Sequence, residues 1–132
     1  MSSILSQIHE YWSGNQTLNA ALPVTSVYLS IVPERLGLPY GVVLPVSSVP
    51  EYTFGSQYLE TYVFQVSIYC FSAEQAEAIA DTVMDQFEFL SVAGALACYR
   101  QNYMIQGEEV AGEHVYSALV TFKLLIERTI GE

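Results

Sequence analysis

The stretch from Tyr58 to Phe71 alternates between two sets of side chains with a period of two, and a helical pattern follows it directly. Because successive side chains of a strand point to opposite faces, one set forms a candidate core face. That set is Tyr58, Glu60, Tyr62, Phe64, Val66, Ile68 and Cys70. A strand with such a face needs neighbouring strands and a covering layer to be stable. The chain must therefore be built around a sheet.

A helix is predicted from Ala73 to about Leu90, because Ser72 and Gln75 have the spacing of a capping box. Its apolar positions form one stripe, namely Ala76, Ile79, Ala80, Val83, Phe87 and Leu90. Its carboxylates fall elsewhere: Glu74, Glu77, Asp81, Asp85 and Glu88. They could form a ladder of ligands for a divalent cation, but we favour a solvated face, since like charges four residues apart repel. The helix should lie on the sheet with its apolar stripe.

The remaining patterns predict an α+β fold: an antiparallel sheet of about four strands, with the central helix and an N-terminal helix packed on one face. Short helices are expected at Ser3 to Trp12 and Thr17 to Ala21, and strands at Val24 to Val32, Tyr40 to Val49, Tyr99 to Ile105 and Glu113 to Glu127. Pro45 indicates an edge strand or a bulge. Gln106 to Gly112 is predicted as an acidic connection in which Gly107 and Gly112 bracket a turn.

Length and charge narrow the function classes. With 132 residues, a single domain spanning 1–132 is expected. Charged residues are only 14% of the chain against about 25% in an average soluble protein, and 52% of residues are hydrophobic. The formal charge of -10 disfavours nucleic-acid binding. The N-terminus has neither the positive charge nor the apolar run of a secretory signal, so we expect no membrane association. Cys70 and Cys98 each lie inside a strand-like run, and we expect both to be reduced, buried thiols.

Residues that could carry chemistry are sparse. His9 and His114 have no neighbours at metal-ligand or catalytic spacing, and we interpret both as surface or partly buried polar residues. Nucleophile-elbow and phosphate-binding glycine motifs are missing from the sequence. We therefore expect a protein that is not an enzyme, with no catalytic, cofactor-binding or metal-binding residue. The alternative from another class is a small enzyme or ligand-binding domain with an aromatic pocket lined by Tyr62, Phe64 and Phe122.

Two segments are candidate contact surfaces. Ser47 to Gln57 is predicted as a long connection between strands that carries large aromatic residues, and it is either a docking arm or a loop that caps its own sheet. The Glu108-Glu109 segment is either a solvent-exposed turn or an acidic surface for a basic partner. The candidate oligomer or partner interface is Tyr52, Phe54, Gly55, Tyr58, Glu108 and Glu109.

The order of these segments resembles a known family. Leu38-Pro39-Tyr40 enters a Val-rich strand, Phe64 to Tyr69 runs into the helix that begins after Ser72, and Val115 to Phe122 closes the chain. This layout, from about Ile4 to Phe122, is similar to that of the tail-terminator, tail-completion and head-tail joining proteins of long-tailed bacteriophages and prophages. The resemblance rests on pattern and order, and no catalytic residue is carried over from it.

The resemblance implies a structural virion protein, assembled in the host cytoplasm and located at the head-proximal end of the tail. Such subunits form a homo-oligomeric ring, commonly a hexamer, that caps the tail tube made of the major tail protein and joins it to the neck. A head-tail connector (neck) protein is the alternative within the same class. With a charge of -10 on each copy, acidic groups lining the ring would let DNA pass through without binding.

Overall fold

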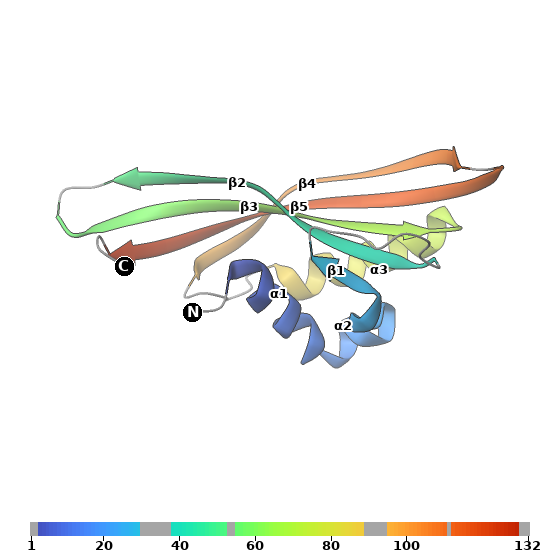
Figure 1. Cartoon of the computed structure of the whole chain (residues 1–132), viewed down its shortest axis with the longest axis horizontal. Coiled ribbons are helices and arrows are strands. Elements are labelled where there is room, and N and C mark those ends of the chain that lie inside the picture. The colour runs from blue at the N-terminus through green and yellow to red at the C-terminus, as the bar shows by residue number, and fades with distance from the viewer. Residues whose placement is uncertain (1–2, 30–37, 53–54, 89–94, 111, 130–132) are drawn as a thin grey trace.

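The computed structural model describes residues 3–29, 38–52, 55–88, 95–110 and 112–129, which form a strongly twisted sheet with helices on one face (Figure 1). Along the chain the elements are α1 (Ile4–Ser13), α2 (Gln16–Ala21), a 3-10 turn (Val24–Ser26), β1 (Val27–Leu29), β2 (Tyr40–Tyr52), β3 (Gln57–Cys70), α3 (Ala73–Phe87), β4 (Ala95–Val110) and β5 (Glu113–Thr129). The strand order across the sheet is β1-β2-β3-β5-β4. The predicted α+β class is thus confirmed.

The sheet has five strands in these residues, one more than the predicted number of about four, and it is mixed. The pairs β2–β3, β3–β5 and β4–β5 are antiparallel, as expected. Strand β1 runs parallel to β2, with Val27 opposite Gly41 and Leu29 opposite Val43. Because β1 is only three residues long, its sequence pattern does not specify its pairing direction. The N-terminal part of the predicted strand, Val24 to Ser26, is a 3-10 turn instead, and residues 30–32 lie outside the described residues.

The core lies between the helices and the face of β3 that the alternation predicted. Phe64, Val66, Ile68 and Cys70 are fully buried on that face, whereas Tyr58, Glu60 and Tyr62 nearer the start of β3 are partly exposed. Strand β5 adds Ala118, Val120, Phe122, Leu124 and Ile126, and α3 adds the buried members of its predicted stripe. Burial of these apolar side chains is the main force that holds the helices on the sheet.

Local caps set the helix starts. The Ser72 hydroxyl accepts a hydrogen bond from the Gln75 backbone N–H at 3.1 Å, which confirms the predicted cap of α3. Ser3 caps α1 and Asn15 caps α2 in the same way. Helix α3 ends at Phe87, where Glu88 turns to an extended conformation, so the predicted end at Leu90 was too late; Leu90 itself lies outside the described residues.

The predicted connection from Ser47 to Gln57 was wrong, because β2 continues to Tyr52 and β3 begins at Gln57. The register of β2 shifts between Pro45 and Ser47, which confirms the predicted bulge. Strand β1 covers β2 only from Gly41 to Val43, so β2 is a sheet edge from Leu44 onward in the described chain. An edge strand tolerates prolines, because the missing N–H is on the side that faces no partner strand.

The predicted connection from Gln106 to Gly112 was also wrong. Strand β4 extends from Ala95 to Val110, well beyond the predicted Tyr99 to Ile105, and pairs with β5 throughout. Gly107 lies within the strand opposite Tyr116, and a Cβ there would come within 3.0 Å of the Tyr116 ring. This glycine therefore allows a close approach of the ring and does not form a turn. Gly112, with φ of 83°, is the turn glycine.

Candidate interaction surface

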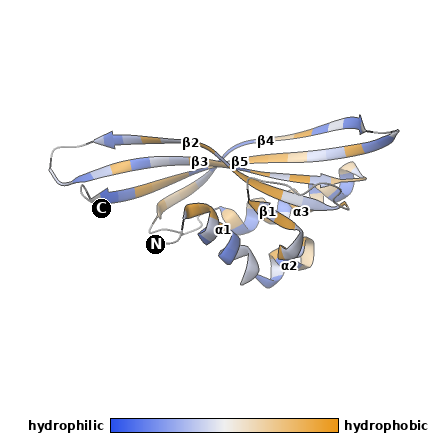
Figure 2. Cartoon of the chain, viewed as in Figure 1, coloured by the Kyte–Doolittle hydropathy of each residue, from blue (hydrophilic) through white to orange (hydrophobic). Residues whose placement is uncertain are grey.

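The sheet face opposite the helices, which we call the open face, has no helix over it in the described residues (Figure 1). Residues directly opposite each other in antiparallel strands share a face, so the register defines rows across it. One row is Val42, Ser67, Leu119 and Met104, and the next is Leu44, Gln65, Thr121 and Asn102. These two rows thus mix aliphatic and uncharged polar side chains, of which Val42 and Ser67 are buried. Figure 2 shows the hydrophobic residues along the strands and the hydrophilic ones toward the hairpin ends.

A shallow groove of about 450 Å³ crosses the open face, lined by Val46, Ser47, Val63, Gln101, Asn102 and Thr121. It lies where both outer strands are irregular: β2 shifts register between Pro45 and Ser47, and β4 shifts between Arg100 and Asn102. Both bulges fall beside the paired residues Phe64 and Phe122 of the inner strands. None of the lining side chains is a carboxylate, histidine, cysteine or other ionisable group, so the groove has no acid or base that could activate the Ser47 or Thr121 hydroxyl as a nucleophile.

The exposed large hydrophobic residues are concentrated on the two outer strands. Apart from Phe71, those found in the described residues lie on β2 (Val46, Val49 and Tyr52) or on β4 (Leu96, Tyr99, Met104 and Ile105). Leu96 is 61% exposed and Val49 is 58% exposed. Both strands also have unpaired outer sides, along β4 and along β2 from Leu44, in the part of the chain that the structure describes. Sheet edges that combine free backbone groups with apolar side chains are sites for pairing with another chain.

The residues predicted as an interface lie at two opposite ends of the sheet (Figure 1). Tyr52 ends β2 with 68% of its surface exposed, and its ring lies 5.1 Å from that of Tyr58 across the hairpin. Gly55, with φ of 111°, is in the turn between these strands, and Phe54 lies outside the described residues. Residues 47–52 extend the sheet and do not fold back as a cap.

Glu108 and Glu109 are exposed members of β4 near its hairpin with β5, at the other end. They are opposite Val115 and His114, and they lie in a strand, not in a turn. The two groups of predicted residues therefore do not form one surface. No sequence pattern predicted the exposed apolar residues of β4, of which Leu96 lies at the register shift between Ala95 and Ala97.

We expect Tyr52→Ala to change the free energy of unfolding by less than about 1 kcal/mol, because it removes only one exposed cross-strand pair. Urea denaturation followed by circular dichroism measures this change. Tyr62→Ala is the matched variant, since Tyr62 packs against the core and should cost more. An equal loss for the two variants would place Tyr52 in the core and contradict the prediction.

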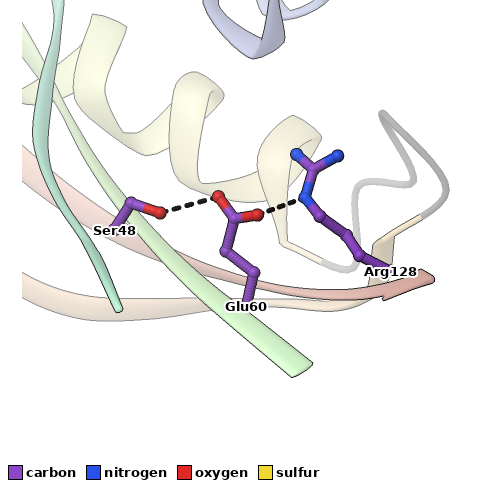
Figure 3. A network of polar contacts seen from close by, with 3 residues as sticks. All are labelled: Ser48, Glu60 and Arg128. Atoms are coloured by element: carbon purple, nitrogen blue, oxygen red, sulfur yellow. Dashed lines mark hydrogen bonds and ion pairs between the residues drawn. The ribbon is translucent and has the colours of Figure 1, made fainter. Parts of the chain in front are cut away.

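One polar network was not predicted from the sequence (Figure 3). The Ser48 hydroxyl donates a hydrogen bond to Glu60 Oε1 at 2.6 Å, and Arg128 Nε donates to Glu60 Oε2 in an ion pair. These residues come from β2, β3 and β5, so the network joins three strands. The side chains of Arg128 and Glu60 are 24% and 15% exposed. The only signal in the sequence was a charge on the predicted core face at Glu60.

Ionisable groups elsewhere have ordinary structural roles. Burial raises the pKa of the Cys70 thiol to about 11, so it is protonated at neutral pH and is a poor nucleophile. Cys98 is buried as well, as predicted. His9 Nε2 lies 3.3 Å from the Val27 carbonyl oxygen, and His114 is exposed. The predicted solvated face of α3 is confirmed, because all five of its carboxylates are exposed.

The alternative prediction, an aromatic pocket lined by Tyr62, Phe64 and Phe122, was wrong. Phe64 and Phe122 are fully buried and stack on each other with ring centroids 5.4 Å apart, and both contact Phe87. Tyr62 is adjacent to Phe64 at 6.4 Å. These rings fill the core and leave no room for a ligand.

Within the residues that the structure covers, no group of three or more His, Cys, Asp or Glu side chains could hold a metal ion. The helices of the described segments are too short or too polar to cross a membrane.

Comparison with solved structures shows which proteins share this fold. A chain from the virion of a native gene transfer agent particle matches with a TM-score of 0.79 and 15% sequence identity, covering 96% of each chain. A second solved chain matches with a TM-score of 0.55 and 17% identity, covering 94% of this chain and 96% of the other. No protein family model and no curated protein sequence matches this chain. The similarity therefore establishes the fold over nearly the whole length of the chain.

Proposed function

We propose that this protein is a structural, non-catalytic virion subunit that forms a ring at the head-proximal end of a phage-like tail. There it would cap the tail tube, as a tail-terminator or tail-completion protein does, and join it to the neck. The observation that carries this proposal is the shared fold, over 96% of both chains, with a chain of a gene transfer agent virion. The segment order that resembles phage tail-terminator and head-tail joining proteins supports the same assignment.

The edges of the sheet support self-association into a ring. A ring needs a heterologous interface, in which one patch of a subunit contacts a different patch of its neighbour. The outer sides of β2 and β4 are two such different patches, at opposite edges of one sheet, and both carry exposed apolar residues. Contact between the β4 edge of one copy and the β2 edge of the next would repeat around the ring, which we expect to be a hexamer.

The acidity of the chain fits a ring through which DNA passes. Each subunit carries a formal charge of -10, and the carboxylates along α3 and near the β4–β5 hairpin are exposed. Negative charge facing the lumen would repel the phosphates of DNA and prevent adhesion. Repulsion between subunits also predicts that salt, by screening these charges, strengthens assembly.

Assembly is expected to depend on the β4 edge. Analytical ultracentrifugation at low and high salt should show an oligomer that is favoured by salt, and negative-stain images should show a ring with an open centre. The double variant Leu96→Lys with Met104→Lys places charges at two exposed positions of β4 and should weaken association at least tenfold, because lysine on an edge opposes strand pairing.

Phe71→Lys is the control, since Phe71 is 55% exposed but lies between β3 and α3, away from both edges. Its assembly should equal that of the unchanged protein. If the unchanged protein is a monomer at every salt and protein concentration, the ring is ruled out. If Phe71→Lys weakens association as much as the β4 variant, the contact does not use this edge.

A further inference from the structure

Three tyrosines form a continuous aromatic row on the open face, on neighbouring strands. Tyr28 of β1, Tyr40 of β2 and Tyr69 of β3 are each partly exposed. The rings of Tyr28 and Tyr40 are 6.5 Å apart in an edge-to-face arrangement, and those of Tyr40 and Tyr69 stack at 4.9 Å. In the described residues no helix lies over this side of the sheet (Figure 1), and part of each ring is exposed.

A carboxylate lies on the same face, two strands away from Tyr69. Tyr69 is opposite Ser117 of β5, and Ser117 is opposite Gln106 of the outermost strand β4. Glu108 is the next residue of β4 on that face and is exposed. Its charge acts on the row: the pKa of the Tyr40 phenol is raised by burial, by Tyr69 and by Glu108.

Three of the four cations of the chain, Arg100, Lys123 and Arg128, are in the described residues, and none of these three lies at this site; Arg35 is outside the described residues. Arg100 donates to the Met84 sulfur on the helix side of the sheet, and Arg128 pairs with Glu60 near the opposite end of β5. Lys123 shares the open face but lies six residues from Ser117, which is about 20 Å along a strand. With four Lys and Arg against fourteen Asp and Glu in the whole chain, a second copy is a poor source of that cation.

We propose that the row of Tyr28, Tyr40 and Tyr69, together with Glu108, binds an arginine side chain of a partner protein. A guanidinium group stacks on aromatic rings and pairs with a carboxylate through two hydrogen bonds, whereas a lysine ammonium offers only a point charge. Nucleic acid does not fit, because Glu108 would repel its phosphates. This inference goes beyond the virion role and does not depend on it.

Titration with two blocked peptides tests this site, one with alternating glycine and arginine and one with lysine in place of arginine. Calorimetry or NMR at low salt should show the arginine peptide binding about threefold or more tighter than the lysine peptide, in line with cation–π stabilisation. Glu108→Gln should weaken arginine-peptide binding by about threefold or more, and Tyr40→Leu should abolish the preference for arginine.

Two controls separate this site from general electrostatics. Asp85→Asn makes the same charge change on an exposed position of α3, and Tyr40→Phe keeps the ring; both should bind as the unchanged protein does. Circular dichroism verifies that each variant is folded, and Tyr69→Leu replaces Tyr40→Leu if that variant does not fold. Equal binding of the two peptides, or equal losses for Glu108→Gln and Asp85→Asn, would overturn the proposal. Because peptide binding is measured without reference to assembly, its failure is distinguishable from failure of the ring.

Discussion

Replacing Phe87 with alanine is expected to lower the free energy of unfolding by about 3–5 kcal/mol, the range for a large aromatic side chain removed from a packed core. Phe87 is fully buried at the end of α3. Its ring centroid lies 5.7 Å from that of Tyr11, 5.8 Å from Trp12, 6.2 Å from Phe64 and 5.4 Å from Phe122. The side chain thus connects α1, α3 and the two central strands.

Urea denaturation, followed at the same time by far-ultraviolet circular dichroism and by Trp12 fluorescence, measures this loss. Phe71→Ala is the matched control, because it removes the same side chain from a position that is 55% exposed. It should change stability by about 0.5 kcal/mol or less. If Phe87→Ala is as stable as Phe71→Ala, the packing of α1 and α3 on the sheet described above is incorrect.

Glu60→Gln is expected to lower the free energy of unfolding by about 1–3 kcal/mol, the cost of depriving a partly buried charge of its partner. The substitution keeps the shape of the side chain but removes the charge that balances Arg128, whose side chain is only 24% exposed. The hydrogen bond from Ser48 can persist, because an amide oxygen also accepts. The loss of unfolding free energy therefore measures mainly the contribution of the ion pair between β3 and β5.

Two further variants test this explanation. Glu51→Gln removes an exposed carboxylate from β2 and should have little effect. Adding Arg128→Met to Glu60→Gln should restore part of the lost stability, since no unpaired charge remains. Equal stability of Glu60→Gln and Glu51→Gln in chemical denaturation would show that the ion pair contributes nothing measurable.

The sequence was most informative where a local pattern and the core agreed. The alternation from Tyr58 to Cys70 identified the buried face of β3, and Ser72 with Gln75 identified the start of α3. Both signals depend only on neighbouring residues, and the tertiary structure did not override them.

The sequence was least informative at the sheet edges, where the same residue types are found both in loops and in outermost strands. The segments that contain Pro50 and the acidic pair Glu108-Glu109 were predicted as connections, yet all three residues lie in long strands. A proline or a charge is tolerated in a strand if that strand is outermost, and the position of a strand in the sheet depends on pairings distant in sequence. The role of Gly107 likewise could not be predicted locally, because it depends on Tyr116, its partner on another strand. The edges, and with them the candidate interaction surface, therefore required the structure.

The paired bulges of β2 and β4 have a mechanical consequence. Both interrupt the outer strands at the level of Phe64 and Phe122, and a bulge bends its strand and increases its twist. The twist of the sheet is therefore concentrated at this level, and the two bulges set the directions in which the β2–β3 and β4–β5 hairpins extend beyond the helix layer.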